Sequence, residues 1–214
     1  MLQDRYHLIW YHEVDEIIMN IIRHMKKIRW DYYLHFLQDV FFEADKYDNS
    51  EVRKKILHEM KVALKMDRSS TKEDLAMYYD YLATDSRNPL RAVTLTEKAV
   101  RILPSNTDRG LLKINIYQNL FIRYLKGKLF DLAFDWCLRV DQLYNEHPEW
   151  RDHNWMVFQV NRGVLLVALR QYTTALMVFE ECRMLILDAG MEGTLDYENV
   201  IEYIVQYTVY PGKI

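Results

Sequence analysis

The sequence is poor in the residues that break helices or build disulfide frameworks. Its 214 residues include only 6 glycines, 4 prolines and 2 cysteines. So few glycines and prolines disfavour a loop-rich or all-β protein and favour long helices. Cys137 and Cys182 lie far apart with no other thiol near them, which fits neither a disulfide framework nor a zinc ligand set. Both fall on apolar faces of expected helices, so we expect reduced thiols in the core.

Long hydrophobic runs and blocks of like charge are also missing. No stretch approaches the ~18 uncharged apolar residues that a membrane-spanning helix needs. The N-terminal MLQDRYHLIWYHEVDE lacks the order of charged, apolar and small residues that marks a secretory signal, so we expect a cytoplasmic protein without a membrane segment. The net charge is −3, and the basic clusters at 26–29 and 53–55 are interleaved with acidic residues. This pattern indicates solvated helix faces and no direct nucleic-acid binding.

The motifs of catalysis and metal binding are absent as well. His12–Glu13 begins like a zinc-protease motif, but Glu16 stands where the second histidine is needed. The sequence has no glycine-rich phosphate loop, no nucleophile elbow and no Cys–His pairing. We therefore expect a protein that is not an enzyme and that uses no metal and no cofactor.

What the sequence does have is apolar residues at helical spacing along most of its length. Half of the residues are hydrophobic and 14% are aromatic, enough for a substantial core. Thr71 with Asp74 resembles a capping box, Pro89 suits the first turn of a helix, and Gly127 and Gly190 suit a tight turn and a C-cap. We expect an all-α protein of about ten helices, at about 3–27, 30–46, 51–66, 72–84, 89–104, 109–126, 129–146, 152–170, 172–189 and 195–209.

Small residues recur at matching positions in these expected helices. Ala92, Ala133 and Ala175 fall early in the fifth, seventh and ninth helices, and closely crossing helices leave room only for small side chains. Ala99 and Pro104 extend the same pattern to a second small position and a terminating proline. The other matching positions are Leu120, Tyr124, Gly163, Tyr172 and Phe179.

Together these positions resemble the tetratricopeptide repeat, a helix–turn–helix unit with a period of roughly 34 residues. The resemblance implies a right-handed α-solenoid of antiparallel helix pairs, with repeats over 67–214 and N-terminal helices over 1–66 that form a degenerate repeat or a bundle. The pattern restarts at Asn199 without the second helix of a pair. We therefore expect an incomplete last pair, covered by another chain or by further residues of a longer protein.

Amide side chains line up on the first helices of successive pairs. Asn119, Asn161 and Asn199 take equivalent repeat positions. An Asn amide offers two donors and an acceptor, so it can hold the C=O and N–H of one residue of an extended peptide. The alternative is that these amides cap or bridge neighbouring helices. The predicted peptide-contacting residues are Asn115, Gln118, Asn119, Ile122, Lys126, Val157, Asn161, Val164 and Asn199.

The segments Asn119–Leu120 and Asn161–Arg162–Gly163, within irregular and aromatic-rich repeats, also resemble the Gram-positive peptide-pheromone receptors of the Rgg, Rap, PlcR and PrgX group. This resemblance implies an intracellular signalling peptide on the concave face, with roles in quorum sensing and transcription regulation. Most of that family carry an N-terminal helix-turn-helix DNA-binding domain, and residues 1–66 lack its basic recognition helix. We expect a peptide- or protein-binding domain, with a homodimer left open. The alternative is a structural scaffold or oligomerisation module that binds a partner helix.

Overall fold

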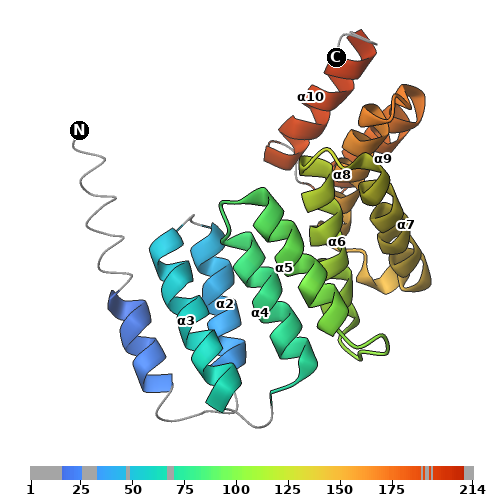
Figure 1. The fold of residues 1–214 in the computed structure, drawn as a ribbon. Helices are drawn as coiled ribbons and strands as arrows, with labels where there is room; N and C mark the ends of the chain where they lie inside the picture. The colour runs from blue at the N-terminus through green and yellow to red at the C-terminus, as the bar shows by residue number, and fades with distance from the viewer. Residues whose placement is uncertain are drawn as a thin grey trace, which may run out of the picture. The chain divides into compact units, whose positions relative to one another are not determined.

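The computed structural model describes residues 16–25, 33–46, 49–66, 70–188, 190, 193 and 195–209. Every regular element in this part of the chain is helical, which confirms the all-α prediction (Figure 1). The remainder of the predicted first helix, residues 30–32 and the His12–Glu13 pair lie outside the described residues. Residues 16–25 are helical, and the elements that follow are α2 (Tyr33–Lys46), α3 (Ser50–Met66), α4 (Lys72–Thr84), α5 (Pro89–Ile102), α6 (Gly110–Lys126), α7 (Phe130–Glu146), η2 (Pro148–Trp150), α8 (His153–Ala168), α9 (Tyr172–Asp188) and α10 (Leu195–Val209).

The helices form two compact units, Met1–Asn106 and Thr107–Ile214. In the first unit α2 packs on α3, α3 on α4, and α4 on α5. In the second, α6 packs on α7, α8 on α9 and α9 on α10, while α8 also contacts α6 and α7. The first unit runs across the predicted boundary after residue 66, because α3 packs on α4. That boundary rested on repeat likeness alone, and it stays a prediction, as does the right-handed solenoid.

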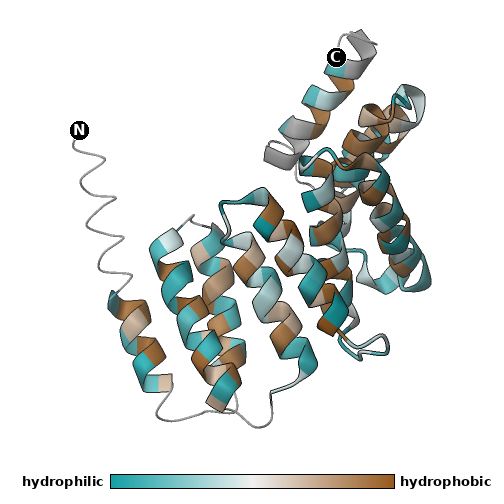
Figure 2. Ribbon diagram, viewed as in Figure 1, coloured by the Kyte–Doolittle hydropathy of each residue, from teal (hydrophilic) through white to brown (hydrophobic). Residues whose placement is uncertain are grey.

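The helices are amphipathic. Figure 2 shows hydrophobic and hydrophilic residues alternating around them. Large apolar side chains that are fully buried, among them Phe41 and Met60 in the first unit and Phe121 and Phe158 in the second, fill the cores. Burial of such side chains is the main favourable contribution to folding, about 1.5–3 kcal/mol for each one. Within the described residues, no helix has the length and apolar character needed to cross a membrane.

The starts of α4 and α5 are fixed by the local signals that the sequence predicted. The Asp74 amide donates to Thr71 Oγ1 at 3.2 Å, and the Thr71 amide donates to Asp74 Oδ2 at 2.9 Å. This reciprocal pair is a complete capping box. At α5 the side chain of Asn88 accepts from the Arg91 amide at 3.1 Å, and Pro89 takes the first helical position. Both predicted helix starts are confirmed.

The turns α6–α7 and α8–α9 share one geometry. Lys128 (φ 58°) and Arg170 (φ 61°) both adopt the left-handed conformation. In each turn the next amide donates back to a helix carbonyl, from Leu129 to Tyr124 at 3.0 Å and from Gln171 to Leu166 at 2.8 Å. The turns are 42 residues apart (170 − 128), as are Ala133 and Ala175 (175 − 133). The second unit therefore contains a structural repeat.

The turn glycines behave differently from one another. Gly190 has φ +67° and its amide donates to the Leu187 carbonyl at 2.9 Å, as expected of a residue that ends α9. Gly127 ends α6 and lies in the predicted turn, but it does not take the left-handed conformation there. Gly127 keeps a helical φ of −77°, and Lys128 takes the left-handed conformation instead.

Small residues lie where the helices of the second unit cross, as the sequence predicted. Ala133 and Ala175 are 0% exposed. Gly163 of α8 faces the ring of Phe179 from α9 so closely that an added Cβ would overlap that ring. On its far side Phe179 stacks on Tyr203 of α10, with ring centroids 5.1 Å apart. A glycine therefore lets one aromatic side chain hold three helices together.

Both cysteines are core residues with free thiols. Cys137 of α7 and Cys182 of α9 are buried and unpaired with each other. Burial raises the pKa of each thiol to about 12, so both remain protonated and unreactive at neutral pH. The prediction of reduced, buried cysteines is confirmed.

Candidate functional site

One side of α6 presents a row of predicted site residues. Asn115, Asn119, Ile122 and Lys126 follow each other at steps of four, three and four, which places them on one helix face. The first three are half-buried and Lys126 is exposed. The opposite side of α6 enters the core, where Phe121 is 0% exposed. The row therefore lies on the accessible side of the helix.

An equivalent row follows α8. Val157, Asn161 and Val164 are half-buried and stand at steps of four and three. Each lies 42 residues after its counterpart on α6 (157 − 115, 161 − 119, 164 − 122), the spacing of the structural repeat. Because α6 and α8 contact each other and the two rows take matching positions of the structural repeat, we consider the rows together as one candidate surface. We call it the α6–α8 face; its residues are Asn115, Asn119, Ile122, Lys126, Val157, Asn161 and Val164.

The Asn161 amide is partly occupied by its own helix. Its Nδ2 donates to the Val157 carbonyl at 2.8 Å, one turn back. Its carbonyl oxygen makes no hydrogen bond with any residue the structure describes. The bond to Val157 fixes the direction of the side chain and leaves an acceptor for a ligand. This bond stays within α8 and neither caps a helix nor bridges to a neighbouring one, so both predicted roles of Asn161 stay predictions.

Gln118 lies in the interior and not on the α6–α8 face. It is 5% exposed, its Nε2 donates to the Asn154 carbonyl at 3.0 Å, and its Oε1 accepts from the Tyr144 hydroxyl at 3.2 Å. It thus joins α6 to α7 and α8. One step along a helix turns a side chain by about 100°, so Gln118 and Asn119 point to different surroundings. The structure gives Gln118 a packing role, and we leave it out of the proposed ligand site.

The third predicted Asn belongs to α10. The backbone of Asn199 is helical, but its side chain lies outside the described residues, so its role stays a prediction. The next residue, Val200, is 0% exposed and belongs to a cluster with Val178 and Phe179 of α9. Val164 packs against this cluster from the α6–α8 face. Val164 therefore connects the α6–α8 face to the core of the second unit.

Charge is divided between the helices of the second unit. The helices of the α6–α8 face carry four cationic side chains and no carboxylate, whereas α7 and α9 carry seven carboxylates. The Arg162 guanidinium of α8 lies 3.3 Å from Asp141 of α7, which offsets its charge. Lys126 is exposed and makes no ion pair within the described part of the chain. The four cations are Lys113, Arg123, Lys126 and Arg162, and the seven carboxylates are Asp131, Asp135, Asp141, Glu146, Glu180, Glu181 and Asp188.

The α6–α8 face presents amide groups, aliphatic surface and the ammonium group of Lys126. Among the described residues, no group of three or more His, Cys, Asp or Glu side chains is placed to hold a metal ion. The face suits hydrogen bonding to a polar backbone and burial of apolar side chains.

Comparisons with known proteins give a fold and no family. No protein-family model matches the chain, and no curated protein does. The chain resembles the crystal structure of BtubC (BKLC) from P. vanneervenii, with a TM-score of 0.67 over 91% of this chain and 79% of that one. The two sequences are 16% identical, so the likeness concerns the all-helical fold alone. The resemblances to tetratricopeptide repeats and pheromone receptors stay predictions.

Proposed function

We propose that this protein is a non-enzymatic peptide- or protein-binding domain of the helical-repeat type, with its ligand extended along the α6–α8 face. The observation that carries the proposal is the pairing of the two rows. Asn119 on α6 matches Asn161 on α8, and Ile122 matches Val164, each 42 residues on (161 − 119, 164 − 122). The two helices therefore offer the same sequence of groups, an amide followed by an aliphatic side chain. A bound extended chain would meet this pattern twice along its length.

The spacing of the rows suits an extended peptide. Packed helices lie about 8–10 Å apart, and an extended chain advances about 3.3 Å per residue. The Asn119 and Asn161 amides therefore meet backbone groups two or three residues apart. Ile122, Val157 and Val164 provide an apolar floor for the side chains between those points. Binding through the backbone explains how such a surface holds a peptide with modest demands on its sequence.

The charge of these helices favours an acidic ligand. α6 and α8 have cations without carboxylates, and the exposed Lys126 stands at one end of the face. A peptide with a carboxylate near that end gains a charge-assisted contact. The exposed ammonium group of Lys126 also raises the rate at which an acidic segment arrives. A cytoplasmic peptide-sensing region of a bacterial transcriptional regulator is the finer form of this proposal, and it rests on the resemblance alone.

The Asn119→Ala/Asn161→Ala double variant tests the proposal. The probe is an acidic extended peptide selected for binding to the native protein from a random library. Each lost amide contact is worth about 1 kcal/mol, so affinity should fall about 30-fold, measured by titration calorimetry. The matched control is Gln142→Ala/Asn145→Ala, which removes two exposed amides from α7 and should leave affinity unchanged. Equal affinity of the folded double variant and the native protein would contradict the proposal.

The alternative is a scaffold or oligomerisation module whose face takes a partner helix. The bond from Asn161 to its own helix favours it, because an occupied amide needs no peptide backbone. Circular dichroism of the bound peptide separates the two cases. A partner helix gains helical signal on binding, whereas an extended peptide does not.

A further inference from the structure

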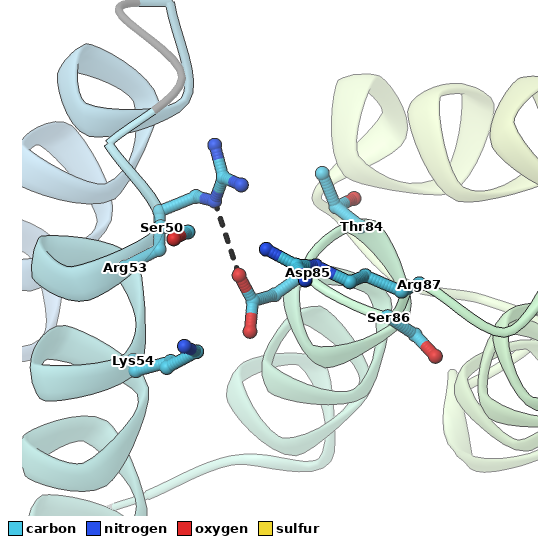
Figure 3. Close-up of a pocket in the computed structure, with 7 residues that line it drawn as sticks. All are labelled: Ser50, Arg53, Lys54, Thr84, Asp85, Ser86 and Arg87. Atoms are coloured by element: carbon cyan, nitrogen blue, oxygen red, sulfur yellow. Dashed lines mark hydrogen bonds and ion pairs between the residues drawn. The ribbon is translucent and has the colours of Figure 1, made fainter.

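The first unit holds a polar pocket where the start of α3 meets the turn between α4 and α5. The pocket has a volume of about 400 Å³, in the range of small-molecule sites. Ligand pockets are usually lined mainly by apolar side chains, but every residue around this one is polar or charged. It therefore suits a small charged ligand. The lining residues, drawn in Figure 3, are Ser50, Arg53, Lys54, Thr84, Asp85, Ser86 and Arg87.

Arg53 forms a fixed wall of this pocket. Its Nε lies 3.2 Å from Asp85 Oδ1, and its second guanidinium nitrogen lies 3.1 Å from Asp45 Oδ1. The Arg53 side chain is only 10% exposed. The two ion pairs connect α3 to α2 and to the α4–α5 turn, and they offset the charges of Arg53 and Asp85. Arg53 thus shapes the pocket and keeps Asp85 from repelling an anion strongly.

Two further cations are available to a ligand. Arg87 is exposed and makes no hydrogen bond or ion pair with the residues that the structure describes. Figure 3 shows its side chain extending toward Asp85. The Lys54 ammonium lies 3.0 Å from Glu51, but both side chains are mostly exposed, so this pair is weak and easily exchanged. A guanidinium and an ammonium group can therefore turn toward the same anion.

Neutral donors complete the lining on both sides. Ser50 is the first residue of α3, at the end of the helix that carries partial positive charge. Ser86 stands across the pocket in the α4–α5 turn. Its hydroxyl donates to the Asn88 carbonyl at 3.3 Å, a long and exposed bond that the hydroxyl can exchange for an anion. Together with Arg87 and Lys54, these hydroxyls surround the space from different elements. Donors from several directions match a tetrahedral oxyanion better than a planar carboxylate.

We propose that this pocket binds the phosphate group, either as the free ion or as the monoester of a small molecule. Arg87 and Lys54 provide the charge, Ser50 and Ser86 donate hydrogen bonds, and Arg53 holds the frame. The site belongs to the first unit and shares no residue with the α6–α8 face. It is therefore independent of the proposed peptide binding.

Titration calorimetry with inorganic phosphate tests this site in the 214-residue chain. Phosphate should bind the native protein, and Arg87→Ala should weaken binding about tenfold through loss of a charge-assisted contact. Arg91→Ala is the matched control, because Arg91 is also exposed, on α5, but does not line the pocket. Lys54→Ala provides a second exposed variant, and a thermal melt of each shows that it is folded.

Three outcomes would overturn the proposal. The first is no heat of binding up to tens of millimolar phosphate. The second is an equal loss of phosphate affinity in Arg87→Ala and Arg91→Ala. The third is acetate binding as tightly as phosphate at the same ionic strength.

A second experiment uses phosphoserine to identify the source of the phosphate. Tighter binding of phosphoserine supports a monoester, because the pocket is larger than the bare ion. Equal binding supports free phosphate.

Discussion

Phe179 shows how a single side chain sets the geometry of several helices. Its ring lies against Gly163 on α8 and stacks on Tyr203 on α10, while Phe179 itself belongs to α9. It is 0% exposed, so no part of the ring can move into solvent without opening the core. The contact requires a glycine on one side and a flat aromatic surface on the other.

Gly163→Ala should therefore destabilise the protein although alanine favours helix. The added methyl group overlaps the Phe179 ring, and such overpacking costs about 1–3 kcal/mol. Urea unfolding measures the loss. The Gly163→Ala/Phe179→Leu variant removes the overlapping ring, so its loss should be smaller than the sum of the two single losses. Strict additivity would show that the two positions do not compete for space.

The role of a single residue could be predicted from the sequence where that role depends on residues nearby in the chain. The sequence predicted the small positions Ala133 and Ala175 and marked Gly163 and Phe179 as repeat positions, because each follows from spacing within a repeat. It misplaced Gln118, whose burial depends on Tyr144 and on the Asn154 carbonyl in other helices. The pocket was beyond reach for the same reason, since it depends on Arg53 and Asp85, which are distant in the chain.

At the scale of elements, helix starts depend on short polar motifs. Thr71→Ala removes the side-chain acceptor at the start of α4 and should cost about 0.5–2 kcal/mol. Thr71→Ser keeps the hydroxyl and is the matched control. Chemical unfolding gives the free energy of unfolding of each variant, and the difference between the two is the contribution of the hydroxyl. If both are equally stable, the capping box contributes nothing measurable.

Helix ends were harder to predict than helix starts. A left-handed residue that is not glycine leaves no clear signal, so the roles of Lys128 and Arg170 came only from the structure. The short helix η2 was also missed, because Pro148 signals the end of α7 but not a new turn. η2 brings Trp150 onto Gly110, far away in sequence, and that contact decides its position.

At the scale of the whole molecule, stability should fall at high pH. The native state keeps Cys137 and Cys182 protonated because burial raises the pKa of each to about 12, whereas an exposed thiol has a value of 9.0. Above about pH 9 the unfolded chain releases these protons and the native state does not. The free energy of unfolding therefore decreases as pH rises, by up to about 1.4 kcal/mol per pH unit for each thiol.

Unfolding between about pH 9 and 10 emphasises this effect, because exposed tyrosines have a higher pKa of about 10 and are only partly ionised there. Burial also raises the pKa values of Tyr33, Tyr81 and Tyr144. The Cys137→Ala/Cys182→Ala variant should lose less stability over this interval than the native protein. An equally steep decrease in both proteins would assign the pH dependence to other groups.

The fold class was predictable at this scale, and the division into units was not. The fold class follows from the helical spacing of apolar residues and the scarcity of glycine and proline, and both can be read from short stretches of the sequence. The boundary after Asn106 depends instead on which helices pack together, above all on α3 against α4. Repeat likeness, which suggested a boundary after residue 66, carries no information on that contact.

The buried thiols give the protein a practical property. Both cysteines of the sequence are closed off from solvent, so the folded chain offers a maleimide dye no native target. A cysteine placed at the exposed position of Lys126 can then be labelled selectively, with no need to remove the native pair. A fluorophore at that position gives up the proposed Lys126 contact but reports directly when a ligand arrives on the rest of the α6–α8 face.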